Sequence, residues 1–176
     1  MRLSSSDDEI LPNLQAKECC SEPIAQAMEY GDERIHRWDS GEPAVYLVPV
    51  DWLKPHEEIL AKNANKLHDM TMRWGGYTKP LLVDSLSGCI LDGHHRYHVA
   101  IELELQRVPA LLYDYLVDDT IKVEAWPASG RTELSKQEVI DMAQSPQLFS
   151  PKTSRHIVEG EVPPILVPLD VLRQES

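Results

Sequence analysis

The segment from Ile90 to Tyr97 combines a glycine with three side chains that donate hydrogen bonds. Gly93 would let the backbone approach a ligand closely, and the free N–H groups of a helix beginning near His94 would point toward that ligand. His94, His95 and Arg96 add side-chain donors, and a guanidinium can hold two phosphate oxygens through parallel hydrogen bonds. This pattern predicts a phosphate-binding turn that leads into a helix.

Asp92 is the acidic residue of this turn, and two interpretations of it stay open. Its carboxylate could hold a divalent cation that bridges phosphate oxygens, as in Mg²⁺ sites built from hard oxygen ligands. It could instead cap the N-terminus of the helix. His94 and His98 lie four residues apart on one helical face, so a zinc pair is a further alternative, although the glutamate of an HExxH motif is missing.

Short strands and helices are expected to position the turn. Residues 80–84 and 89–91 predict a hairpin that enters the turn directly, and residues 94–105 carry apolar side chains at helical spacing. A second helical pattern runs from His56 to Trp74 and stops at a pair of glycines. Further patterns predict strands at 44–50, 108–112 and 121–126, a capped helix from Ser135, and an extended loop over 149–168. These short elements favour a compact α+β domain over a doubly wound fold.

Composition divides the chain at residue 44. Residues 1–43 are rich in polar and acidic residues and lack sustained periodicity, so we expect a partly disordered N-terminal extension with a short helix around residues 24–30. Residues 44–176 would form the nucleotide-binding domain.

Charge and cysteine content limit the binding partners and the cellular compartment that we expect for this protein. The 17 basic and 29 acidic residues give a net charge of −12, which disfavours nucleic-acid binding but allows a small cationic pocket. The three cysteines suit a reducing compartment, and neither a signal peptide nor an apolar run of the roughly 18 residues that span a bilayer is visible. We therefore expect a cytoplasmic protein without membrane contact.

Three segments resemble one known family. Residues 90–103, ILDGHHRYHVAIEL, are similar to the signature turn of the ParB/sulfiredoxin-like fold, also called the ParB-like nuclease domain family, in its free L-serine kinase branch. Residues 48–58, VPVDWLKPHEE, resemble the opening strand of that branch with its catalytic glutamate, and residues 149–156, FSPKTSRH, resemble its distal PKTTRH segment. The resemblance runs from about Val45 to Leu172 and implies a mixed sheet with packed helices.

Two other branches of this fold fit the sequence less well. A sulfiredoxin carries its catalytic cysteine between the glycine and a histidine of the turn, where this chain has His94. A chromosome-partitioning ParB is expected to continue into a DNA-binding helical domain, for which too little chain follows.

The resemblance implies a kinase of serine metabolism that transfers a phosphoryl group from a nucleotide to the hydroxyl of free L-serine, or of a similar small hydroxy amino acid. Glu57 would be the general base that accepts the proton of the attacking hydroxyl, with Glu58 as the alternative because one sequence cannot rank two adjacent carboxylates. Mg²⁺ would accompany the nucleotide, and both ADP and ATP stay open as donors.

The same resemblance implies where the acceptor binds. Trp126 matches a tryptophan that lines the serine pocket, although a core aromatic is an equally simple interpretation. The amino acid would be held by a segment formed of Lys152, Thr153, Ser154, Arg155 and His156. Within it the Arg155 guanidinium suits a carboxylate, and Lys152 could stabilise a carboxylate or a phosphate.

Two functions of other classes fit the turn by itself. A non-catalytic nucleotide-binding regulator would keep the phosphate cradle without turnover, and a metal-dependent nuclease or hydrolase would use the His94 and His98 pair. A simple binding module needs the turn alone, so the co-occurrence of Glu57, Trp126 and residues 152–156 favours the kinase.

Overall fold

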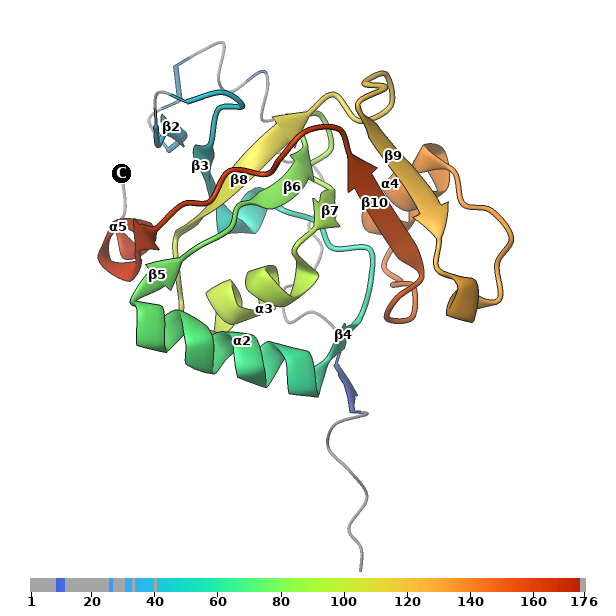
Figure 1. The fold of residues 1–176 in the computed structure, drawn as a ribbon, viewed down its shortest axis with the longest axis horizontal. Coiled ribbons are helices and arrows are strands. Elements are labelled where there is room, and N and C mark those ends of the chain that lie inside the picture. The colour runs from blue at the N-terminus through green and yellow to red at the C-terminus, as the bar shows by residue number, and fades with distance from the viewer. Residues whose placement is uncertain (1–8, 12–25, 27–30, 33, 40, 175–176) are drawn as a thin grey trace, which may run out of the picture.

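A five-stranded mixed sheet forms the centre of the computed structural model, which describes residues 9–11, 26, 31–32, 34–39 and 41–174. Its strand order is β2-β3-β8-β6-β7, and β6 and β8 run parallel while the other neighbours are antiparallel. The strands are β2 (His36–Arg37), β3 (Tyr46–Pro49), β8 (Arg107–Tyr113), β6 (Leu81–Asp84) and β7 (Ile90–Asp92). The α+β class with a mixed sheet is thereby confirmed (Figure 1).

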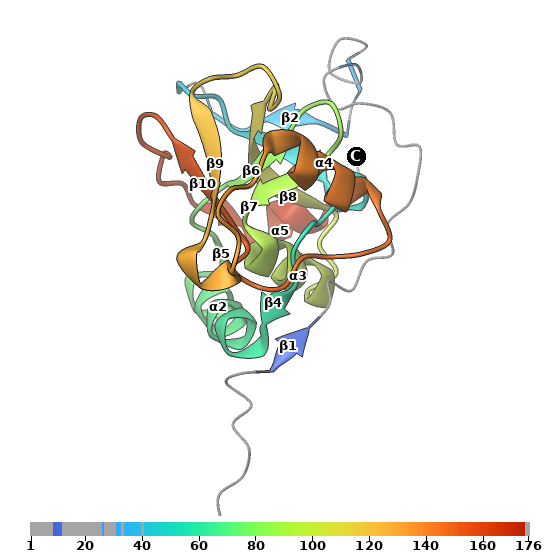
Figure 2. The same cartoon turned by 90° about the vertical axis from the view of Figure 1, so that its right-hand side faces the viewer.

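Helices cover both faces of this sheet. The helices α2 (Ala61–Trp74) and α3 (His94–Glu102) pack against each other below it, and α4 (Lys136–Gln144) lies on the other side (Figures 1 and 2). Strand β6 alternates accordingly, since Leu81 and Val83 belong to the core with α3 while Leu82 belongs to the core with α4. Such alternation is the expected pattern of a strand that is buried on both faces.

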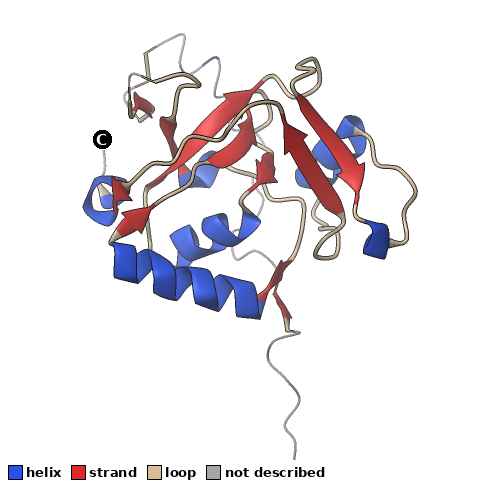
Figure 3. Ribbon diagram, viewed as in Figure 1, coloured by secondary structure: helices blue, strands red, loops and turns tan. Residues whose placement is uncertain are grey.

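Three short pairings surround the sheet (Figure 3). The strands β9 (Ile121–Ala125) and β10 (Ser154–Val158) are antiparallel over five residue pairs. The strand β5 (Gly76–Tyr77) pairs with β11 (Val167–Pro168), after which α5 (Leu169–Arg173) ends the described chain. The third pair joins β1 (Ile10–Leu11) to β4 (Ile59–Leu60), and two 3₁₀ helices, η2 (Val50–Trp52) and η3 (Pro127–Ser129), complete the elements.

Two predictions of local structure were wrong, and both errors concern long-range pairing. The helix expected from His56 begins at Ala61, because the preceding backbone pairs with Phe149 and with β1 instead. The segment 149–168, expected as a loop, contains β10 and β11, whose partners are 29 or more positions earlier in the chain. The hairpin of β6 and β7, the start of α3 at His94 and the capping box of Ser135 and Glu138 are confirmed.

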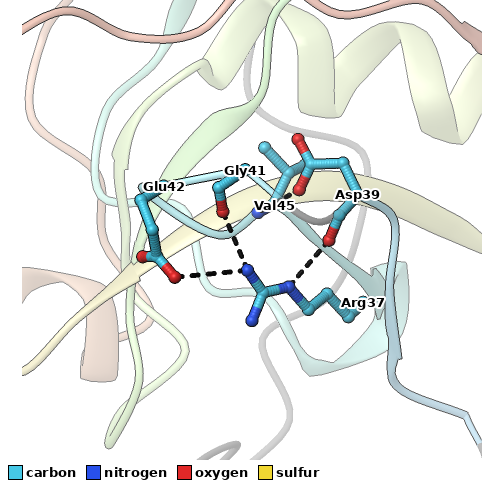
Figure 4. Close-up of polar contacts among 5 residues, drawn as sticks. All are labelled: Arg37, Asp39, Gly41, Glu42 and Val45. Atoms are coloured by element: carbon cyan, nitrogen blue, oxygen red, sulfur yellow. Dashed lines mark hydrogen bonds and ion pairs between the residues drawn. The ribbon is translucent and has the colours of Figure 1, made fainter.

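Parts of the segment 1–43 contact the domain. Strand β2 extends the central sheet through β3, and the Arg37 guanidinium donates to the carbonyl oxygens of Asp39 and Gly41, at 2.7 and 2.8 Å (Figure 4). The Val45 N–H donates to the Asp39 carboxylate at 3.3 Å. The helix expected around residues 24–30 lies almost entirely outside the described residues, and the domain division at residue 44 stays a prediction. None of the helices in the described part of the chain has the length and apolar character that a membrane crossing requires.

Candidate functional site

The turn before α3 is built so that only glycine fits its centre. Gly93 has φ of +107°, and a Cβ atom placed there would lie 2.7 Å from the Leu81 Cγ and 2.9 Å from an Arg96 guanidinium nitrogen. Gly93 is also the N-cap of α3, which has no side-chain cap, so the N-capping interpretation of Asp92 is wrong. The first N–H groups of the helix therefore remain available to a ligand.

A cavity of about 450 Å³ opens in front of this turn. It is bordered by the turn and α3 on one side and by the start of β10 with Trp126 on the other. Most of the residues predicted for the site line it: Glu57, Asp92, Gly93, His94, His95, Arg96, Trp126, Ser154, Arg155 and His156. Lys152 and Thr153 do not line the cavity, and their contribution comes from the backbone behind it.

Glu57 is the most completely held carboxylate of the site. Its Oε1 accepts hydrogen bonds from the Thr153 and Ser154 N–H groups and from the Ser154 hydroxyl, at 3.1, 2.9 and 3.1 Å, and its Oε2 accepts from the Lys152 N–H at 3.2 Å. Burial nevertheless raises the pKa of Glu57, against the lowering effect of these donors. A carboxylate with these properties is fixed in position and is a stronger base than an exposed one.

His94 and His95 join the turn to the segment that carries Glu57. The His94 Nε2 accepts a hydrogen bond from the His56 N–H, and the His95 Nε2 accepts one from the Leu60 N–H, both at 3.1 Å. Desolvation lowers the pKa of His95 to about 4, so its ring is neutral at pH 7 and carries its proton on Nδ1. The two histidines thus set the spacing between the turn and Glu57.

His56 is a site residue that was not predicted from the sequence. Its ring is fully buried, and its Nε2 lies 2.8 Å from the Ser154 Oγ, which in turn donates to Glu57. His156 also lines the cavity, and its Nε2 lies 2.8 Å from the Tyr115 hydroxyl. Burial lowers the pKa of His156 to about 4. The only available signal was the position of His56 directly before Glu57.

On the β10 side of the cavity, the Arg155 side chain lies over an aromatic ring. The Arg155 guanidinium lies 5.2 Å from the centre of the Trp126 ring and 3.6 Å from the Glu124 carboxylate. About half of each charged side chain is exposed, so this ion pair contributes little to stability and leaves the guanidinium accessible. The main-chain N–H of Trp126 donates to the Thr153 carbonyl, which keeps the tryptophan beside β10.

The arrangement can bind an anion and remove a proton. Because His95 and His156 are neutral, positive charge on the cavity lining comes from Arg96 and Arg155, together with the helix N-terminus. Asp92 is exposed on the lining and offers oxygen ligands of the kind that Mg²⁺ takes up along with phosphate oxygens. Within the described residues no cluster of three His, Cys, Asp or Glu side chains could hold a metal by itself.

Comparison with known sequences finds relatives among small-molecule kinases. The chain is 27% identical over 129 residues to the ADP-dependent L-serine kinase SerK of Thermococcus kodakarensis and 34% identical over 84 residues to an ATP-dependent L-serine kinase of Staphylothermus marinus. It is 35% identical over 74 residues to a ParB-like protein of Sulfolobus acidocaldarius. These alignments cover 66%, 46% and 42% of the chain but only 53%, 33% and 36% of the respective relatives. No family model matches the chain.

Solved structures with the same fold include nucleotide complexes. A free serine kinase in complex with AMP superposes with a TM-score of 0.65 at 19% identity, covering 72% of this chain and 92% of the other. SbnI of Staphylococcus aureus, truncated at its C-terminus, superposes with a TM-score of 0.65 at 15% identity over 75% of this chain and 90% of the other. These likenesses establish the fold, and the sequence relatives named as L-serine kinases confirm the resemblance predicted from the three segments.

Proposed function

We propose that this protein is a small-molecule kinase that transfers a phosphoryl group from a nucleotide to the hydroxyl of free L-serine. The observation that carries the proposal is the placement of Glu57, a half-buried carboxylate with a raised pKa, across one cavity from the Gly93 turn. A phosphate-binding site without chemistry has no need of such a base. The relatives named as L-serine kinases support the same activity.

The proposed reaction assigns a role to each wall of the cavity. The nucleotide phosphates bind the N–H groups at the start of α3 and the Arg96 guanidinium, while Arg155 pairs with the serine carboxylate beside Trp126. The serine hydroxyl oxygen forms a bond to the terminal phosphorus as the bond to the leaving nucleotide oxygen breaks, and Glu57 takes the hydroxyl proton. Catalysis of this kind rests on positioning and on charge stabilisation.

The other residues of the site position these groups. The backbone of Lys152, Thr153 and Ser154 fixes the Glu57 carboxylate, and His94 and His95 hold its segment against the turn. Asp92 would hold a Mg²⁺ ion that accompanies the nucleotide, and such an ion would neutralise charge on the phosphate oxygens. The ADP- and ATP-dependent relatives make both nucleotides candidate donors.

A donor-by-acceptor screen tests the proposal. Purified protein is incubated with Mg²⁺, each of ADP, ATP and CTP, and each of L-serine, L-threonine and L-homoserine, and the phosphorylated amino acid is identified by mass spectrometry. We expect O-phosphoserine with ADP or ATP. Tight nucleotide binding without any phosphorylated amino acid, unchanged by Glu57→Gln, would instead identify a nucleotide-binding regulator.

A further inference from the structure

A second cavity, of about 430 Å³, lies at the opposite end of α3 from the candidate site. It is bordered by the C-terminal end of α3, the start of β8, η2 and the residue that follows α5. The nine residues of α3 separate the two cavities by about 13 Å, at about 1.5 Å per residue. The two cavities share no lining residue.

Arg107 is the unusual residue of this second cavity. It lines the cavity at the first position of β8 and is only 6% exposed, yet none of the described residues accepts a hydrogen bond from its guanidinium or forms an ion pair with it. A guanidinium has five N–H donors, and an arginine is rarely this buried without a partner. Its donors are therefore open to water or to a ligand that enters the cavity.

The surrounding charges restrict what that group can be. Arg34 also lines the cavity, but it forms two hydrogen bonds with the Asp32 carboxylate, at 2.8 and 3.1 Å, so its charge is already balanced. Two exposed carboxylates, Asp51 and Glu104, line the same cavity as Arg107, and neither forms an ion pair with another described residue. A dianion such as phosphate would be repelled by this pair, whereas a ligand with one positive and one negative group would match it.

We propose that the second cavity binds the zwitterion of an α-amino acid. The carboxylate of the amino acid pairs with the Arg107 guanidinium, which suits it because of its planar fork of donors. The ammonium group faces Asp51, Glu104 and the carbonyl end of α3, where the helix dipole also favours a cation. Binding here is independent of the kinase activity proposed above.

NMR titration of the full, ¹⁵N-labelled chain tests this site. Each standard L-α-amino acid is added up to about 10 mM, and acetate, ethylammonium and inorganic phosphate serve as single-charge and phosphate probes. We expect at least one amino acid to cause saturable shifts of the amide signals of residues 104–107, with the single-charge probes and phosphate about tenfold or more weaker. Binding in the candidate site is read separately from the amides of residues 93–95.

Three variants complete the test. Arg107→Gln should weaken the amino acid about tenfold or more, since it removes the charge-assisted hydrogen bonds, and Arg73→Gln, an exposed arginine at the end of α2, should leave binding unchanged. Glu104→Gln alters only an exposed side chain and should also weaken binding, so it decides the question if the Arg107 variant does not fold. The proposal is overturned if no amino acid shifts residues 104–107, if phosphate binds more tightly than every amino acid, or if neither Arg107→Gln nor Glu104→Gln weakens binding.

Discussion

The substitution Glu57→Gln separates a catalytic carboxylate from a structural one. Glutamine has nearly the same shape, and its amide oxygen can still accept the N–H groups of Thr153 and Ser154. Its amide nitrogen would face the Lys152 N–H, so one hydrogen bond is replaced by two opposed donors. The carboxylate charge and its capacity to accept a proton are lost.

The effects of Glu57→Gln on kcat and on the free energy of unfolding differ in size and in sign. Loss of a general base lowers kcat by about 10² to 10⁴-fold. The lost hydrogen bond costs about 1 kcal/mol of stability, but the variant no longer buries a charge. The pKa of Glu57 is raised in the folded chain, so ionisation of Glu57 opposes folding. This destabilising effect is present at pH values above the pKa of Glu57 in the unfolded chain, where the charged form prevails. The free energy of unfolding at pH 7 should therefore change by about 1 kcal/mol or less, or rise.

Initial rates of O-phosphoserine formation and urea unfolding at pH 7 measure both quantities on the same samples. Glu58→Gln is the matched control, because Glu58 is adjacent but does not line the cavity, and we expect near-normal rates from it. Relative to wild type, the stability of the Glu57 variant should increase as the pH is raised from the acidic range to 7. A large loss of stability with kcat reduced only in proportion to the folded fraction would refute a catalytic role for Glu57.

Three other predictions concern the turn, the acceptor side and the pH dependence of stability. Gly93→Ala should destabilise the fold by about 1–3 kcal/mol and abolish nucleotide binding measured by calorimetry, whereas Gly130→Ala, which also has positive φ but open space around it, should cost less and leave binding intact. Arg155→Gln should raise the KM for L-serine about tenfold or more, and Arg131→Gln, another half-exposed arginine over an aromatic ring, should not; equal KM values would remove Arg155 from the site. Because the pKa of His156 is about 4 in the folded chain against the usual 6.5, stability should fall as the pH drops from 6.5 toward 4, and His156→Gln should flatten that part of a urea-midpoint profile.

The sequence was sufficient to predict those parts of the site that are contiguous in the chain. The hairpin of β6 and β7, the glycine turn and the start of α3 follow one another along the sequence, and their periodicity and turn residues specify them locally. The resemblance of three separate segments then predicted that Glu57 and residues 152–156 belong to the same site. The cavity brings Glu57, Ser154, Arg155 and His156 to that turn.

The other parts of the fold and of the site depend on contacts between segments far apart in the chain, which no local sequence pattern encodes. Strand β10 owes its conformation to β9, and the segment before α2 is held by Phe149 and by the rings of His94 and His95. These two histidines, predicted as donors to a phosphate, use Nε2 to accept backbone N–H groups, and their role toward a ligand stays a prediction. A sequence pattern gives the spacing of such residues but not which backbone donor each ring nitrogen meets.

Transfer of a labelled phosphoryl group tests the central claim most directly. ADP labelled in its β-phosphate and ATP labelled in its γ-phosphate are each incubated with wild-type protein, Mg²⁺ and L-serine, and the label is followed by chromatography. The proposed function predicts that label from at least one donor appears in O-phospho-L-serine, and that Glu57→Gln slows its appearance about 10² to 10⁴-fold. Label that remains in the nucleotide with both donors, or that appears only as inorganic phosphate, would contradict it.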